Sequence, residues 1–454
     1  MDFKSINPAT EKPIATYPEY SPEKIERRLR RAESAFGGWK RSSFSERTAL
    51  LKSVGMLLRS RRSDLAAIMT AEMGKPIVSA EQEIDKCADA CDFFADHADA
   101  MLKDEPIESD AVSSYIRREP LGAILAIMPW NFPFWQVFRF AAPNVKAGNV
   151  AVLKHAPNVS GCALAIEKLF NDSGFPRGVF TTLLVDTPTV RGIIEHPAIK
   201  AVTLTGSERA GRAVGALAGA ALKKTVLELG GSDPFIVLAD ADISVVAVAA
   251  AAARCVNSGQ SCIAAKRFIV EEPIADEFEA AFSLAMSEMK IGDPTKRSTQ
   301  IGPLARKDLA DHLADQVTRS VKAGARVVVG GHQPDKGFFY PPAVLADVRP
   351  GMAVFDEETF GPVAAVVRAA DDHDLLWLAN ISTFGLGASI WTRDIDRAQR
   401  LAAGLEVGGV FINGPVKSDP RLPFGGIKNS GFGRELSLLG LHEFMNAKTV
   451  WIGS

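Results

Sequence analysis

Apolar positions follow two different rhythms along this chain. Over the first hundred residues they recur every three or four positions, which predicts helices. From about residue 120 onward, short apolar runs alternate with amphipathic segments of helical length. The early helices are expected at Pro22–Glu33, Ser45–Arg61 and Val78–Met101.

The alternation up to residue 230 is typical of βαβ units, and hence of a parallel, doubly wound sheet that could bind a nucleotide. Its strands are expected at Ala123–Ile127, Val150–Leu153, Val179–Val185, Ala201–Leu204 and Val226–Leu229. The helices between them are expected at Phe134–Val145, Ser160–Asp172, Val190–His196 and Ala210–Ala221.

A second α/β domain is predicted after the turn Gly230–Pro234, where glycines and a proline interrupt two apolar runs. Its strands are expected at Arg267–Val270, Arg326–Val329, Val363–Val367 and Gly408–Ile412. Its helices are expected at Ile243–Val256, Ile274–Lys290, Ala305–Ala323, Asp372–Ala379 and Asp394–Ala403.

Two extended segments fit neither domain. Ser113–Arg118 precedes the first sheet, and Lys448–Ile452 lies in the C-terminal tail. Lone strands leave unpaired edges that must be covered. We therefore expect these segments to pair with each other or with another subunit.

Composition narrows the class of protein. Of 454 residues 47% are hydrophobic, and 52 basic side chains nearly balance 54 acidic ones, which excludes an intrinsically disordered chain. The balance disfavours nucleic acid and anionic membranes as partners. No apolar run approaches the roughly 18 residues of a membrane span, and no signal-type apolar core follows Met1, so a cytoplasmic protein is expected.

The five cysteines are too few for a disulfide framework in a chain of this length. Cys87, Cys91, Cys162 and Cys255 fall in segments expected to be helical, where cysteine packs as a small hydrophobe. Cys262 differs, because it lies in a loop of small residues that a substrate carbon could approach; its thiolate would be a nucleophile. No two histidines stand at ligand spacing, and no His-Glu-x-x-His or Cys-x-x-Cys pair occurs, so no metal is expected.

Other polar residues follow the predicted strands of the first sheet. The dinucleotide fingerprint G-x-G-x-x-G is absent, but the turn Thr205–Gly211 leads into a helix whose free N–H groups could hold a phosphate. Lys154 and Glu228 each stand at the end of a predicted strand. Lys154 could contact a ligand or could be an ordinary surface lysine. Glu228 could be a general base or could cap the strand end. Asn131, in a stiff aromatic loop, could donate to an oxyanion.

Together these residues resemble the aldehyde dehydrogenase superfamily. The matching blocks occur in family order over nearly the whole chain, and they are Pro129–Pro133, Lys154, Thr205–Ser207, Glu228–Gly231, Gly259–Cys262, Glu358–Pro362 and Pro423–Gly431. The family binds NAD or NADP without the missing fingerprint. The resemblance implies two Rossmann-like domains and a small β oligomerisation arm. It places the NAD(P)-binding domain at 1–108 and 121–230, the catalytic domain at 231–430, and the arm at 109–120 and 431–454.

The resemblance also implies a mechanism. Cys262 attacks the aldehyde carbonyl, and Asn131 and the Cys262 backbone N–H hold the oxyanion. Hydride transfer to the nicotinamide leaves a thioester, which a water activated by Glu228 hydrolyses. Lys154 would contact the adenosine ribose, Ser207 the pyrophosphate and Glu358 the nicotinamide ribose. Trp130 and Phe360 would line the path. The full set of implied cofactor contacts is Met128, Trp130, Lys154, Ala156, Pro157, Gly206, Ser207, Leu229, Glu358 and Phe360.

Cofactor choice is suggested by one departure from the pattern of NAD-restricted members. Those members usually carry a glutamate three residues after the lysine, which repels a 2′-phosphate. Here that position is Pro157. We therefore expect NADP to be used, with or without NAD.

The substrate expected from the resemblance is succinate semialdehyde, as in short bacterial succinate-semialdehyde dehydrogenases. Trp135 and Arg139 are four residues apart on a predicted helix, where the guanidinium could grip a carboxylate, and Ser418 could add a hydroxyl. The alternative is that Arg139 pairs with an acid. Other short aldehydes, a non-redox thiol hydrolase and a non-enzymatic protein remain alternatives, and a homodimer or homotetramer is expected.

Overall fold

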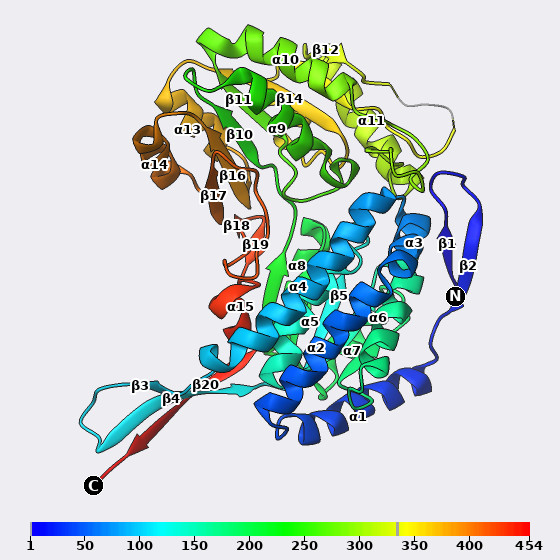
Figure 1. Ribbon diagram of the computed structural model, residues 1–454, viewed down its shortest axis with the longest axis vertical. Helices are drawn as coiled ribbons and strands as arrows, with labels where there is room; N and C mark the ends of the chain where they lie inside the picture. The colour runs from blue at the N-terminus through cyan, green and yellow to red at the C-terminus, as the bar shows by residue number, and fades with distance from the viewer. Residues whose placement is uncertain (1, 333–335) are drawn as a thin grey trace.

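Two lobes and a projecting arm make up the molecule. The computed structural model describes residues 2–332 and 336–454 (Figure 1). The lower lobe in Figure 1 is built on a six-stranded sheet and the upper lobe on a seven-stranded sheet. These two sheets, mostly parallel and covered by helices, confirm the predicted fold class.

The six-stranded sheet has the order β19-β9-β8-β5-β6-β7. All neighbours are parallel except β19, which runs antiparallel to β9. The register aligns Ile127 with Lys154 and Thr205 with Glu228, so the strand ends that carry polar residues meet at one edge. The strands are β5 (Ala123–Met128), β6 (Val150–His155), β7 (Phe180–Thr182), β8 (Ile199–Thr205), β9 (Lys224–Glu228) and β19 (Gly431–Phe432).

Helices cover this sheet, and α5 (Trp135–Ala147) is the most enclosed of those that shape the site. Every one of its residues is buried, because it packs between the sheet and the helices α2 and α4. It ends at Gly148, whose φ of 101° favours glycine. The other helices of the lobe are α1 (Pro22–Trp39), α2 (Phe44–Ser60), α3 (Arg62–Met73), α4 (Ile77–Met101), α6 (Ser160–Asp172), α7 (Val190–Glu195) and α8 (Glu208–Ala220).

The seven-stranded sheet has the order β12-β13-β14-β11-β10-β16-β17, and only β12 is antiparallel to its neighbour. Its strands are β10 (Pro234–Val237), β11 (Arg267–Glu271), β12 (Arg326–Val329), β13 (Ala343–Ala346), β14 (Val363–Ala369), β16 (Gly387–Trp391) and β17 (Gly409–Ile412). Its helices are α9 (Ile243–Cys255), α10 (Ala275–Ser287), α11 (Lys307–Lys322), α12 (Ala353–Asp356), α13 (Asp372–Asn380) and α14 (Ile395–Gly404).

The arm is a three-stranded antiparallel sheet that projects from the lower lobe (Figure 1). Its central strand β4 (Ser113–Pro120) pairs with β20 (Met445–Ile452) along its whole length and with β3 (Glu105–Pro106) on the other side. The two stray segments therefore pair with each other. Between β19 and the arm, α15 (Ser437–His442) packs against α5 and α4.

Several elements differ from the sequence expectations. The first residues form a hairpin of β1 (Asp2–Ile6) and β2 (Pro13–Pro18), so the expectation of helices throughout the first hundred residues was wrong there. Strand β7 is shorter than expected, and α3, β10, β13 and β16 were missed. These three strands are fully buried, and short runs that are apolar on both faces lack the alternation that identifies a strand. The two-stranded sheet of β15 (Phe384–Gly385) and β18 (Ile427–Lys428) was also missed.

Within residues 2–332 and 336–454, no helix is long and apolar enough to cross a membrane. The same residues contain no group of three or more histidine, cysteine, aspartate or glutamate side chains that could hold a metal ion.

Candidate active site

The loop that carries Cys262 turns sharply after α9. Asn257, Ser258 and Gly259 all have positive φ, at 54°, 56° and 76°. A Cβ at Gly259 would lie 2.2 Å from the carbonyl carbon of Gly361, so this position requires glycine. Left-handed backbone at the two non-glycine residues costs about 1–3 kcal/mol each. The surrounding contacts must offset that cost.

A buried lysine, Lys266, is hydrogen-bonded to the backbone of this loop. The ammonium of Lys266 donates to the backbone carbonyls of Ser261, Cys262 and Ala264 at 3.1, 2.8 and 3.0 Å. Burial lowers the pKa of Lys266 to about 8, while Glu358 acts in the opposite direction. Sequence reasoning missed this residue. A lysine four positions after the nucleophile, at the start of a buried strand, was the available signal.

The Asn131 side chain is fixed against the same loop. Its Nδ2 donates to the backbone carbonyl of Gln260 at 3.1 Å, and the backbone carbonyl of Asn131 accepts from Nδ2 of Asn257 at 2.7 Å. An amide nitrogen carries two hydrogens, so one N–H of Asn131 remains for another acceptor. The backbone N–H of Cys262 also has no acceptor in the described part of the chain. These two donors suit an oxyanion.

Glu228 ends β9 with its carboxylate buried. Its Oε1 has no hydrogen-bond partner in the described residues. A Cβ at Gly425 would lie 2.7 Å from that oxygen, so the glycine leaves room for the carboxylate. Burial raises the pKa of Glu228 well above its ordinary value; Arg139 opposes this shift and Glu435 adds to it. A raised pKa makes the ionised group a stronger proton acceptor.

The thiol of Cys262 is unionised at neutral pH in this structure. Burial raises its pKa to about 12, while the positive charges of Arg139 and Lys266 act in the opposite direction. Attack on a carbonyl requires the thiolate. Proton transfer to a nearby base therefore has to accompany it.

Two cavities meet at Cys262. The larger, of about 890 Å³, is lined by seven of the predicted residues besides Cys262. The smaller, of about 360 Å³, is lined by Cys262 and by the three residues predicted to bind substrate, Trp135, Arg139 and Ser418. The seven are Trp130, Asn131, Gly206, Ser207, Leu229, Glu358 and Phe360.

The larger cavity fits a dinucleotide. At its wall α8 begins, with Ser207 accepting from the N–H of Ala210 at 3.3 Å, and the N–H groups of Glu208 and Arg209 have no acceptor in the described chain. These donors suit a pyrophosphate. Glu358, whose carboxylate accepts from the N–H of Gly231 at 2.9 Å, could bind ribose hydroxyls.

The remaining predicted cofactor residues lie at the ends of strands in the same sheet. Met128 ends β5, Lys154 lies near the end of β6, and Ala156 and Pro157 follow that strand. None of them lines the larger cavity itself. Lys154 is buried, and this burial lowers its pKa.

The family profile described as aldehyde dehydrogenase matches residues 1–450. The chain belongs to the aldehyde dehydrogenase family. A succinate semialdehyde dehydrogenase [NAD(P)+] from Escherichia coli K12, Sad, is 51% identical over 448 residues, which are 98% of this chain and 97% of that protein.

Solved structures of other proteins agree closely with this aldehyde dehydrogenase chain. Gox0499, studied for cofactor and substrate selection, superimposes with a TM-score of 0.98 at 44% identity, covering both chains fully. A succinic semialdehyde dehydrogenase from Streptococcus pyogenes in complex with NADP+ has a TM-score of 0.97 at 37% identity, also covering both chains fully. The match extends to the whole fold.

In this member of the family, Arg139 is already paired. Its guanidinium forms a buried ion pair with Glu435, donates to Oγ1 of Thr205 at 3.3 Å, and lies 4.5 Å from the ring centroid of Phe424. This is the alternative considered from the sequence, in which Arg139 pairs with an acid. Its charge is therefore balanced within the protein.

A second cation in the smaller cavity was missed from the sequence. Lys86, on α4, donates to the hydroxyl of Ser418 at 2.8 Å and lies 4.2 Å from the ring centroid of Trp135. The indole of Trp135 donates to the same hydroxyl at 3.0 Å. The signal in the sequence was a lysine three residues after Glu83 on the predicted helix. The structure shows that Glu83 is buried.

Proposed function

We propose that this chain oxidises succinate semialdehyde to succinate with NADP+ or NAD+. The observation that carries the proposal is the position of Cys262. It lies where a cavity suited to a dinucleotide meets a smaller cavity that carries cations and a hydroxyl. The names of the relatives support both the substrate and the cofactor. A thiol hydrolase without redox chemistry would leave the larger cavity unused.

The first step joins the sulfur to the aldehyde. Cys262 gives up its proton to solvent water, and its Sγ atom bonds to the carbonyl carbon. The oxygen that gains charge is held by Nδ2 of Asn131 and by the Cys262 N–H. Removing one such donor typically costs a factor of about 10²–10³ in kcat.

Oxidation then leaves the acyl group on the enzyme. When bound, the oxidised nicotinamide accepts a hydride from the substrate carbon. The carbonyl re-forms as a thioester to Cys262. Glu228 accepts a proton from a water that attacks this thioester and passes it to the departing Cys262 sulfur, which releases succinate and restores the thiol.

An initial-rate panel tests the proposed substrate. We expect NADPH formation, followed at 340 nm, to give the highest kcat/KM with succinate semialdehyde. Glutarate and malonate semialdehydes, glycolaldehyde, acetaldehyde and benzaldehyde are the comparisons. A higher kcat/KM with any uncharged aldehyde would reject succinate semialdehyde as the substrate, and thioester hydrolysis without NADPH formation would favour a thiol hydrolase.

Pro157 should decide the tolerance for NADP. We expect Pro157→Glu to lower kcat/KM for NADP at least about 10-fold while changing that for NAD less than threefold, since a carboxylate repels the 2′-phosphate. Steady-state kinetics with both cofactors measure this. Pro157→Gln is the control, because it has the same size without the charge. A wild-type preference for NAD of a hundredfold would contradict NADP use.

We also propose that the arm joins copies of the chain into a homodimer or homotetramer. β20 lies at the edge of the arm sheet, and Val112, Trp451 and Ile452 are exposed there. An exposed apolar strand edge favours pairing with another chain.

The proposed domain boundaries place the NAD(P)-binding domain at 1–108 and 121–230, the catalytic domain at 231–430, and the arm at 109–120 and 431–454. Strand β19, within the last segment, joins the first sheet and not the arm.

A further inference from the structure

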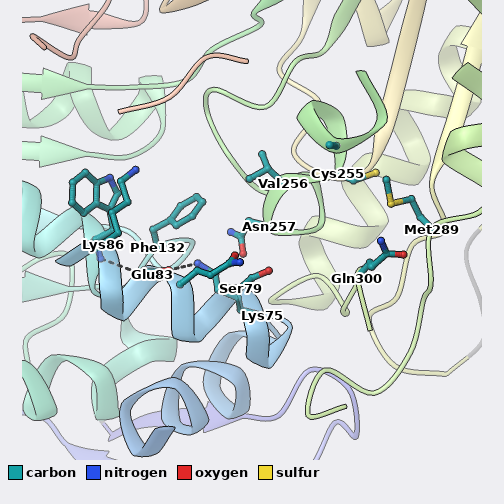
Figure 2. Close-up of a pocket in the computed structure, with 13 residues that line it drawn as sticks. Lys75, Ser79, Glu83, Lys86, Phe132, Cys255, Val256, Asn257, Met289 and Gln300 are labelled. Atoms are coloured by element: carbon teal, nitrogen blue, oxygen red, sulfur yellow. Dashed lines mark hydrogen bonds and ion pairs between the residues drawn. The ribbon is translucent and has the colours of Figure 1, made fainter. Parts of the chain in front are cut away.

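Lys86 stands at the boundary between the smaller cavity at Cys262 and an adjoining cavity of about 330 Å³. Figure 2 shows Lys86 beside Phe132, with Val256 across the cavity. These neighbours are apolar, and Ile263 and Phe424 line the smaller cavity as well. Three cations line the smaller cavity, Lys86, Arg139 and Lys417; Arg139 is ion-paired with Glu435 and Lys417 is exposed, which leaves Lys86 as the buried cation available to a charged ligand group.

No carboxylate of the described chain pairs with Lys86, because the nearby acids are engaged elsewhere. Glu83, three residues earlier on α4, forms a buried ion pair with Lys75, and its Oε1 accepts from the N–H groups of Phe134 and Trp135, both at 2.9 Å. Lys86 thus carries a positive charge that nothing in direct contact balances.

The carboxylate of Asp419 is also paired with a residue other than Lys86. Its carboxylate accepts two hydrogen bonds from the Arg421 side chain, at 2.8 and 2.6 Å, although it directly follows Ser418. A partly buried ammonium without a carboxylate partner is unfavourable unless a ligand supplies the negative charge. Burial, together with the charge of Arg139, accordingly lowers the pKa of Lys86 to about 8.

The Ser418 hydroxyl completes the donor set. Its oxygen accepts from Nζ of Lys86 at 2.8 Å and from Nε1 of Trp135 at 3.0 Å. These two bonds use both lone pairs, so the hydroxyl hydrogen is left to donate, and the described chain offers it no acceptor. The ammonium and the hydroxyl together suit the two oxygens of a carboxylate.

We propose that Lys86, with Ser418, binds the remote carboxylate of the substrate and so selects aldehydes that carry an acid at the other end. The inference rests on the proposed function, for which it names the residue that determines specificity. Arg139 keeps a structural role beside Glu435 and Glu228. Trp135 positions the Ser418 hydroxyl.

The variant Lys86→Met tests this, since methionine keeps the chain length and removes the charge. We expect KM for succinate semialdehyde to rise about 10- to 100-fold with little change in kcat. With butanal, which lacks the carboxylate, kcat/KM should change less than threefold. Lys86→Arg should restore part of the selectivity. Lys103→Met, at an exposed lysine that follows the same helix and lines neither cavity, is the matched control for a loss of charge alone and should change KM less than threefold.

A pH series gives a second readout. The ratio of kcat/KM for succinate semialdehyde to that for butanal should fall above pH 8, because free Lys86 loses its charge there. The steps at Cys262 and Glu228 serve both aldehydes, so their titrations cancel in the ratio. The other charged or titratable groups that face Lys86 do not change charge near pH 8. Arg139 and Glu83 are ion-paired. Arg421 lowers the pKa of Asp419 to about 2, and burial raises the pKa of Cys87 well above its usual value.

Inhibition by succinate separates this inference from the proposed function. Succinate should inhibit butanal oxidation competitively in the wild type and at least 10-fold more weakly in Lys86→Met. Selectivity and inhibition unchanged in Lys86→Met would overturn the role of Lys86. A wild type that oxidises butanal but not succinate semialdehyde would overturn the proposed function, and the succinate inhibition would still decide whether Lys86 binds a carboxylate.

Discussion

Replacing Cys262 by alanine should lower NADPH formation from succinate semialdehyde at least about 10⁴-fold, because no other thiol can form the bond to the aldehyde carbon. In the described structure the other four cysteines are buried. Burial raises the pKa of Cys255 to about 12 and that of Cys87 well above its usual value. Activity measured at 340 nm with purified protein gives the result.

The control for this loss is Cys91→Ala, at a buried thiol inside α4. It removes a small packed side chain, so it should cost about 1 kcal/mol of stability and leave kcat nearly unchanged. NADP binding, followed by quenching of tryptophan fluorescence, should be retained in Cys262→Ala. A Cys262→Ala enzyme with more than a hundredth of wild-type activity would reject Cys262 as the nucleophile.

Replacing Glu228 by glutamine should separate the two halves of the reaction. Glutamine cannot accept a proton, so hydrolysis of the thioester should slow about 10²- to 10³-fold. Rapid mixing should then show a burst of one NADPH per active site, followed by slow turnover. Intact mass spectrometry should find a succinyl group on Cys262.

Hydroxylamine provides the control for the Glu228 variant. It attacks a thioester without a general base, so it should restore turnover in Glu228→Gln and have little effect on the wild type. Loss of the burst would instead assign Glu228 to deprotonation of Cys262. Normal steady-state turnover would exclude both roles. In the wild type, hydrolysis should become faster as pH rises through the elevated pKa of Glu228.

Much of the fold could be read from apolar periodicity because most elements follow a regular pattern. Apart from α3, α12 and α15, the helices from Pro22 onward lie close to where the sequence predicted them, as do the main strands of the first sheet. Short strands such as β10 and β13 did not stand out, because they are buried on both faces. The hairpin at residues 2–18 was missed because the pattern after Pro22 was extended to the start of the chain.

The candidate chemistry was readable wherever it depends on residues close together in sequence. The loop Asn257–Cys262 and the residues Asn131 and Glu228 stood out by their small, aromatic or glycine-rich neighbours. The structure places Cys262 where the two cavities meet, Asn131 in the lining of the larger cavity, and Glu228 buried at the end of β9.

Only the tertiary structure decided which charged side chains are ion-paired within the protein and which are not. The sequence by itself determined the family, the α/β fold, the nucleophile candidate and the two segments of the arm, because these depend on local patterns and motifs. It could not show that Arg139 is paired with Glu435, 296 positions away in the chain, or that Lys86 meets Ser418, 332 positions away. Long-range pairing sets which cation is balanced within the protein and which is left for a substrate. That balance exists only once the chain has folded.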